Sequence, residues 1–115
     1  MSEIKRLHAG ARYSEGSMHA GLVYLAGQVA IGGGTSIESQ VAEVLASIDK
    51  LLAEAGSSKA RILMAQIYLA DMADYPGLNS VWDKWVGTSP PARATVQAKL
   101  AKPEWKVEIV VTAAL

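Results

Sequence analysis

The pattern of hydrophobic and polar residues along the chain predicts a series of strands interrupted by two helices. Residues 22–31, 62–69 and 107–114 are largely apolar and partly β-branched, which is typical of strands buried in a sheet. Residues 92–99 alternate between small or apolar side chains and polar ones, the pattern of a strand with one buried face. Residues 4–17 have room for one or two further short strands.

A first helix is predicted over residues 37–55 by a stripe of apolar side chains at helical spacing. Thr35 and Glu38 have the spacing of a capping box, and Gly56 can close the helix in a left-handed conformation. A second helix is predicted to begin at Asp74, a candidate N-cap, and to end before the two consecutive prolines. The apolar residues on one face of that second helix are Tyr75, Leu78, Trp82 and Trp85.

The order of these elements predicts an α+β single domain over residues 1–115, with a mixed sheet of about six strands and two helices on one face. We expect residues 92–99 and 107–114 to form a hairpin. The polar face of that hairpin would hold Arg93, Thr95, Gln97, Glu108 and Thr112. Because the strands are too apolar for their second face to lie in water, the pattern also predicts a symmetric oligomer with Arg93 and Glu108 at or beside the subunit interface.

Composition and charge narrow the class of protein. The chain has 115 residues, of which 50% are hydrophobic and 19% charged, as in a globular domain. Eleven basic and eleven acidic side chains give a formal net charge of zero, without the basic excess typical of nucleic-acid-binding proteins. No apolar run approaches the roughly 18 residues of a membrane span, and the first ten residues lack the hydrophobic core of a signal peptide. We therefore expect a soluble, cytoplasmic protein.

The sequence disfavours several kinds of catalytic centre. With no cysteine, the chain has no disulfide, no thiolate zinc site and no cysteine nucleophile. His8 and His19 lack neighbouring ligands, so we expect no metal, and residues 32–34 are glycines without the Lys-Ser or Lys-Thr of a P-loop. The spacing of the serine, histidine and acidic residues does not exclude a serine–histidine–carboxylate triad, but the sequence has no nucleophile-elbow motif that would indicate one. We expect no cofactor.

Arg93 and Glu108 are the strongest candidates for chemistry. Arg93 follows two prolines and lies between two alanines, and a guanidinium on a partly buried face offers a planar fork to a carboxylate or phosphate. An internal ion pair of Arg93, with Glu108 or with an acid of another subunit, is an equally good interpretation. Glu108 is the lone charge in its strand, where it could orient a water molecule or form a salt bridge between strands.

Three further positions give weaker signals. Gly27 interrupts an apolar strand, which indicates either a bulge or a close approach of the backbone to a ligand. Tyr13 and Ser14 are polar candidates near the N-terminus, and Asn79 lies in the second helix away from its apolar face. On spacing alone Asn79 is equally well explained as a solvated surface residue.

Several motifs together resemble the Rid family, also called YjgF-like reactive-intermediate deaminases. They are Tyr13-Ser14, the strand end at residues 26–28 (AGQ), residues 91–96 (PARATV) and residues 106–109 (KVEI). The resemblance covers nearly the whole chain. It is closest to the YoaB-like branch, through residues 82–85 (WDKW) and 93–98 (RATVQA).

The resemblance implies a chorismate-mutase-like fold assembled as a homotrimer, with clefts between subunits and no cofactor. It implies hydrolysis of small reactive enamine or imine acids, such as 2-aminoacrylate or 2-iminobutanoate, to 2-keto acids and ammonia. By the same resemblance, Arg93 would clamp the substrate carboxylate and Glu108 would position the attacking water. The substrate-binding residues that it implies are Tyr13, Gly27, Asn79 and Thr95.

Two positions depart from the deaminase pattern. Thr95 stands where many members have cysteine, and Ala26 stands where the deaminase type usually has serine. A threonine hydroxyl can still donate a hydrogen bond, whereas alanine removes the polar group. These changes favour the alternative of a non-catalytic trimer that binds or senses small carboxylates. A third interpretation, ribonuclease or translation inhibitor, is a label that some members carry, and the zero net charge argues against it.

Overall fold

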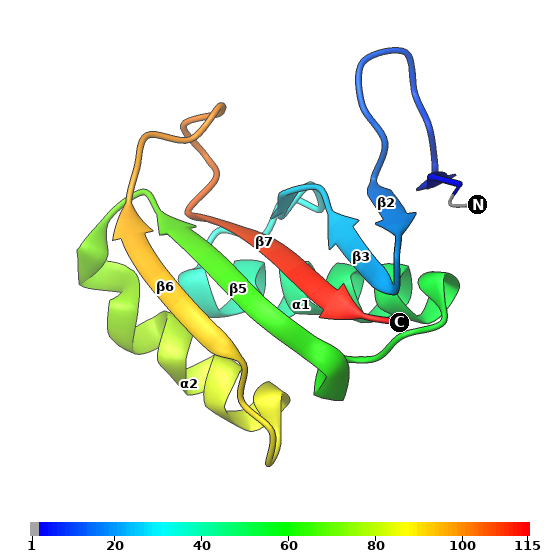
Figure 1. Cartoon of the computed structure of the whole chain (residues 1–115). Coiled ribbons are helices and arrows are strands. Elements are labelled where there is room, and N and C mark those ends of the chain that lie inside the picture. The colour runs from blue at the N-terminus through cyan, green and yellow to red at the C-terminus, as the bar shows by residue number, and fades with distance from the viewer. Residues whose placement is uncertain (1–2) are drawn as a thin grey trace.

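The computed structural model describes residues 3–115, which form one seven-stranded sheet and two α-helices (Figure 1). Residues 1–2 of the predicted domain lie outside the described residues. The strands are β1 (Lys5–Leu7), β2 (Gly16–His19), β3 (Leu22–Leu25), β4 (Gln28–Val29), β5 (Ile62–Leu69), β6 (Ala92–Gln97) and β7 (Val107–Ala114). The helices are α1 (Ile37–Ala55) and α2 (Tyr75–Val86), with two 3-10 turns, η1 (Lys59–Arg61) and η2 (Met72–Asp74).

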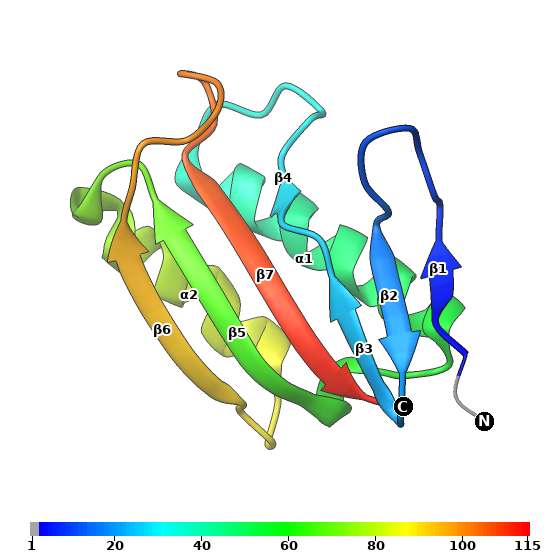
Figure 2. The same cartoon turned by 45° about the horizontal axis from the view of Figure 1, so that its top comes forward.

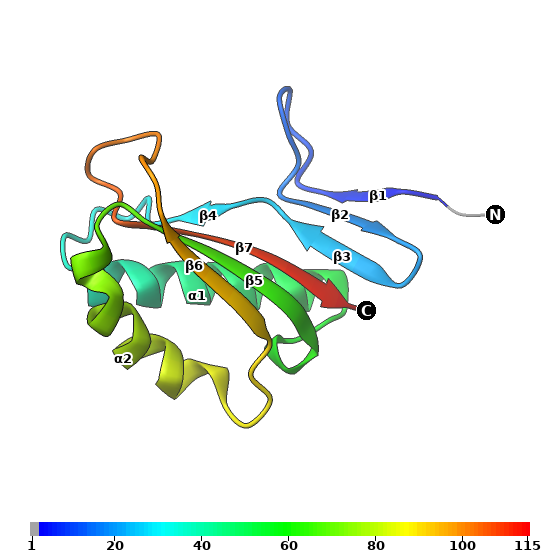
Figure 3. The ribbon, with the colours of Figure 1, turned by 60° about the vertical axis from the view of Figure 1, so that its left-hand side comes forward.

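The sheet is mixed, with the strand order β1-β2-β3-β7-β5-β6, and β4 pairs with β7 beside β3 (Figure 2). β5 and β6 are parallel, because α2 crosses between them, and every other pairing is antiparallel. Both helices lie against the same face of the sheet (Figure 3). The predicted α+β architecture, with two helices on one face of a mixed sheet, is therefore confirmed.

The predicted hairpin of residues 92–99 and 107–114 is wrong, since β5 lies between β6 and β7. Ala65 of β5 pairs with Arg93 on one side and with Val111 on the other, so these three residues share a face. Glu108 is three positions from Val111, and an odd separation along a strand places it on the opposite face. The alternating patterns were correct for each strand, but they did not say which strands were neighbours.

The predicted bounds of α1 agree with the structure, while its N-terminal cap does not. Ser36, not Thr35, is the N-cap, and its hydroxyl accepts a hydrogen bond of 3.0 Å from the backbone N–H of Ser39. The predicted capping box of Thr35 and Glu38 is therefore wrong. Gly56 closes the helix with a φ of 84°, as predicted for a left-handed C-cap.

The predicted strand over residues 22–31 is broken into β3 and β4 at Ala26 and Gly27. The backbone N–H of Ala26 donates to the carbonyl of Glu15 instead of continuing the ladder with β7. At the start of α2, Asp74 occupies the N-cap position but makes no side-chain cap bond. The carboxylate of Asp71 instead accepts from the N–H of Ala73 in the preceding turn.

The two faces of the sheet differ sharply in what covers them. The helix-covered face holds the core, whose largest fully buried side chains include Leu45, Ile48, Leu52, Ile67, Leu69, Leu78 and Ile109. The other face has no element over it (Figure 3). Its side chains, here called the open face, come from β3, β5, β6 and β7: Tyr24, Gln66, Tyr68, Ala94, Val96, Glu108, Val110 and Thr112. Tyr24 and Val96 are about half exposed, at 48% and 49%.

Neither helix of the described residues is long and apolar enough to cross a membrane.

Candidate functional site

The guanidinium of Arg93 is held by three side chains of α2. Tyr75, Asn79 and Trp82 follow one another at spacings of four and three residues, which places them on one helix face directed at β6. The Nη2 of Arg93 donates to the hydroxyl of Tyr75 at 3.0 Å and to the Oδ1 of Asn79 at 2.9 Å. Its Cζ lies 5.2 Å from the centre of the Trp82 ring and 5.7 Å from that of Tyr75. These contacts fix the orientation of the cation.

The partners of Arg93 are neutral, so its positive charge is not compensated by the chain itself. Within residues 3–115 the one contact that can be an ion pair joins His8 to Glu54, and it is one only when His8 is protonated. An ion pair of Arg93 with Glu108 of the same chain is ruled out, because the two residues lie on opposite faces of the sheet. The guanidinium is therefore oriented, and its positive charge has no acidic partner among the described residues.

Thr95 lies two residues after Arg93 on the same face of β6, opposite Ile67 of β5. Its Oγ1 is buried and has no hydrogen-bond partner among the described residues. A buried hydroxyl without a partner costs about 1–3 kcal/mol, so Thr95 is an unusual position within the described residues.

Glu108 and Gly27 meet on the other side of the sheet. A Cβ added to Gly27 would overlap the Oε2 of Glu108, so only glycine leaves room for the carboxylate there. No hydrogen bond to the Glu108 carboxylate is recorded within residues 3–115. Of the two interpretations of Gly27, the structure thus supports a close approach, made here to the carboxylate of Glu108.

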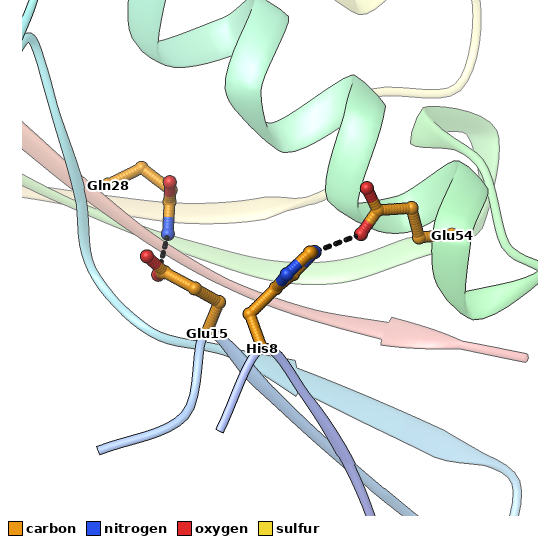
Figure 4. A network of polar contacts seen from close by, with 4 residues as sticks. All are labelled: His8, Glu15, Gln28 and Glu54. Atoms are coloured by element: carbon orange, nitrogen blue, oxygen red, sulfur yellow. Dashed lines mark hydrogen bonds and ion pairs between the residues drawn. The ribbon is translucent and has the colours of Figure 1, made fainter. Parts of the chain in front are cut away.

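Tyr13 lies in the loop between β1 and β2, and 64% of it is exposed. Two polar contacts fasten this loop to the rest of the chain (Figure 4). The Nε2 of His8 lies 2.6 Å from the Oε2 of Glu54 in α1, and Gln28 of β4 donates to Glu15 at 3.1 Å. The loop is therefore tied to α1 and β4 rather than to the elements around Arg93.

The residues predicted to form one site fall into three places in the chain. Arg93, Asn79 and Thr95 lie together between β6 and α2, whereas Gly27 and Glu108 lie together beside β7. β2, next to the Tyr13 loop, is four strand spacings from β6, or about 19 Å. A single chain cannot bring all of these side chains around one small molecule.

Two residues around Arg93, Tyr75 and Trp82, are predicted from the sequence only as part of the apolar face of the second helix. Trp82 is indeed buried, with 5% exposed, but one face of its ring is turned to the cation. Their spacing from Asn79 could have found them, because it puts all three on one helix face; the expectation that Asn79 lies away from the apolar face is wrong. What the sequence could not supply is that this face meets β6.

Surface hollows also lie away from Arg93 and Glu108. One of about 690 Å³ lies beside Trp105, and one of about 470 Å³ is lined by Tyr13 and its neighbours in the loop between β1 and β2. In the described part of the chain, no three His, Asp or Glu side chains gather in a way that could hold a metal ion.

Comparison with known proteins connects these features to a family. Residues 3–115 match the family described as Endoribonuclease L-PSP. The chain is 56% identical over 115 residues to a RutC family protein of Haemophilus influenzae, covering 96% of this chain and 97% of that protein. It is 42% identical over 113 residues to the RutC family protein YoaB of Escherichia coli, covering 97% and 98%. The crystal structure of a YjgF family member from Neisseria meningitidis has a TM-score of 0.95 at 50% identity, covering 97% of this chain and 94% of that one.

The matches span the β6 strand with Arg93, the β7 strand with Glu108 and the helix-covered sheet between them. The chain belongs to the Rid family, also called the YjgF or RutC family.

Proposed function

We propose that this chain is the subunit of a cofactor-free hydrolase that converts small enamine or imine acids to 2-keto acids and ammonia. The observation that carries the proposal is Arg93, a guanidinium fixed in place by Tyr75, Asn79 and Trp82 without an acid to neutralise it. Such a group is suited to hold a small carboxylate in one orientation. We expect the protein to act in the cytoplasm, where reactive amino-acid intermediates arise.

The proposed reaction requires the protein mainly to hold the substrate and a water molecule in position. An enamine acid such as 2-aminoacrylate tautomerises to the imine, and water adds to C2 to give a carbinolamine. Loss of the nitrogen as ammonia then leaves the keto acid. In this scheme Arg93 holds the carboxylate, Thr95 donates its hydroxyl to the ligand, and Glu108 accepts a hydrogen bond from the attacking water. Tyr13, Asn79 and the backbone of Gly27 complete the binding site.

A site of this composition needs two chains. Arg93 and Glu108 point from opposite faces of one sheet, so the Glu108 that meets a given Arg93 belongs to a second copy. The open face is suited to bury against another copy, since it carries half-exposed apolar side chains with no covering element. We propose a homotrimer with each cleft built by two neighbouring subunits.

The second candidate function is a non-catalytic trimer that binds small carboxylates. It is favoured by Ala26, which precedes the Gly27 that lies against Glu108 and has no side-chain group that could hydrogen-bond a ligand. The variant Ala26→Ser separates the two candidates. A hydrolase lacking an optimal donor should gain turnover from the added hydroxyl, whereas a pure binding protein should gain none.

An endoribonuclease activity, which the family description names, is disfavoured by the zero formal net charge. Binding to phosphate backbones draws on clustered basic residues and weakens as salt rises. Absence of RNA binding at both low and high salt would exclude this activity.

The deciding experiment generates 2-aminoacrylate enzymatically and measures keto-acid release with and without this protein. We expect the wild-type protein to accelerate release and Arg93→Ala to lower kcat/KM at least about 100-fold, the scale of losing a buried charged anchor. Arg93→Lys should also be strongly impaired, because an ammonium cannot reproduce the planar fork.

The matched control is Lys84→Ala, which removes an exposed cation from α2 without touching Arg93. Its rate should equal that of the wild type. Equal rates for the wild type and Arg93→Ala would remove Arg93 from the mechanism and overturn the proposal.

A further inference from the structure

The hydrogen bonds of Arg93 occupy the part of the guanidinium that a carboxylate needs. A guanidinium binds a carboxylate with two hydrogen bonds along either of two edges, and each edge includes one hydrogen of Nη2. In this chain Nη2 has two acceptors, the hydroxyl of Tyr75 and the Oδ1 of Asn79, which match its two hydrogens. A carboxylate arriving at either edge therefore meets a hydrogen that is already donated.

The two acceptors differ in how easily they can leave. Asn79 is half-buried, and its bond to Arg93 is partly shielded from solvent. Tyr75 is the first residue of α2, 38% exposed, and its bond to Arg93 lies at the surface. The phenol can swing into water by rotation about its own side-chain bonds, without moving the helix. Tyr75 is therefore the acceptor that an incoming carboxylate can displace.

We infer that the hydroxyl of Tyr75 covers Arg93 in the empty site and is displaced by the substrate carboxylate. Tyr75 thus sets how strongly a ligand must bind Arg93 in order to displace it, and a carboxylate can do so because a hydrogen bond from a guanidinium to an ionised oxygen is stronger than one to a neutral oxygen. A carboxylate can win this exchange, whereas a neutral carbonyl or amide of the same size gains nothing by it. The inference rests on the proposed function, since it assigns Arg93 to a carboxylate ligand.

The test is binding of pyruvate, a stable 2-keto acid, measured by calorimetry on the wild type and on single variants. Tyr75→Phe keeps the ring beside Arg93 and removes only the competing oxygen. We expect its dissociation constant for pyruvate to fall about three- to tenfold, the net scale of one ordinary hydrogen bond. Asn79→Ala should weaken binding, because that side chain orients the cation. Ser80→Ala, an exposed α2 residue bonded only to the carbonyl of Gly77, should leave binding unchanged.

Binding of pyruvamide, the neutral amide of pyruvate, is a second test. The wild type should bind it far more weakly than pyruvate, and Tyr75→Phe should improve the binding of pyruvamide by no more than it improves that of pyruvate, because the neutral oxygen gains less from the freed Nη2 hydrogen. In the hydrolysis assay the same variant should lower KM and leave kcat unchanged, a split that a merely structural role of Tyr75 does not produce.

The outcomes separate this inference from the proposed function. Pyruvate binding that depends on Arg93 but is unchanged or weakened in Tyr75→Phe overturns the inference alone. Absence of pyruvate binding to the wild type, or equal binding to Arg93→Ala, overturns both.

Discussion

Arg93 and Glu108 act on the same small molecule in the proposed reaction, but their surroundings within one chain differ. Around Arg93, α2 provides two hydrogen-bond acceptors and an aromatic face, so the cation is fixed before any ligand arrives. Around Glu108, the structure provides only space, in the form of Gly27 and an uncovered sheet face. The surroundings of Arg93 are thus formed within one chain, whereas we propose that those of Glu108 are completed by a second copy.

This difference indicates which part of the proposed site a single chain can form by itself. The helix-covered face is stabilised within the chain, and Arg93 acquires its partners there, although the hydroxyl of Thr95 does not. In the account proposed above, the open face acquires its partners by assembly, so that the oligomer would be part of the site. Three changes test this comparison, from the largest expected effect to the smallest.

Tyr24→Lys places a charge on the open face, where a second copy is proposed to pack. Because a charge buried without a partner is costly, we expect monomers in place of trimers and about a 100-fold loss of hydrolysis. Light scattering with size-exclusion chromatography measures the assembly. Ala53→Lys on the exposed side of α1 is the control and should remain trimeric and active. A Tyr24→Lys protein that stays trimeric and active contradicts the proposed role of the open face.

Gly27→Ala tests the space beside Glu108. The added Cβ meets only the end of a flexible carboxylate, so the midpoint of thermal unfolding should stay close to that of the wild type. The displaced carboxylate should lower kcat about tenfold, the scale of a misplaced catalytic group. Gly32→Ala is a matched control, because its Cβ meets the carboxylate end of Glu43, away from the site. Equal kcat in both variants would separate Glu108 from the reaction.

Glu54→Gln loosens the loop that carries Tyr13. Since His8 is 58% exposed and Glu54 32%, their contact stabilises the fold by no more than about 1 kcal/mol. We expect a KM about twofold higher at unchanged kcat, with the difference shrinking at high salt. Glu43→Gln, on the same helix, serves as the control. A kcat effect instead of a KM effect would mean that the loop does more than hold Tyr13.

Much of the fold could be predicted from hydrophobic periodicity. The bounds of α1 and β5 and the α+β layering follow from patterns local to each segment, and Gly56 marks the end of α1 through its own backbone conformation. The partners of each strand are not a local property. The prediction of a hairpin was wrong for this reason. The sequence of residues 92–99 does not indicate that α2 returns the chain so that β6 lies parallel to β5.

Prediction of the site from the sequence was limited in the same way, because it also depends on which strands are neighbours. Arg93 and Glu108 could be singled out as charges in apolar strands, and Asn79 through a family resemblance. Their separation onto two faces depends on strand pairing, so the sequence alone grouped them wrongly on one face. Tyr75 was not predicted as a site residue, because an aromatic residue at helical spacing is equally typical of a hydrophobic core. Only its position at the exposed start of α2 brings its hydroxyl to Arg93.

The central claim is that Arg93 and Glu108 of one site come from different chains, and mixed trimers test it most directly. Arg93→Ala and Glu108→Gln subunits, each inactive alone, are unfolded, mixed in equal amounts and refolded together. If each site combines two chains, random assembly regenerates intact sites at about a quarter of the positions, and that share of wild-type activity should return. A mixture no more active than the separate variants would show that both residues act from one chain, which contradicts the account.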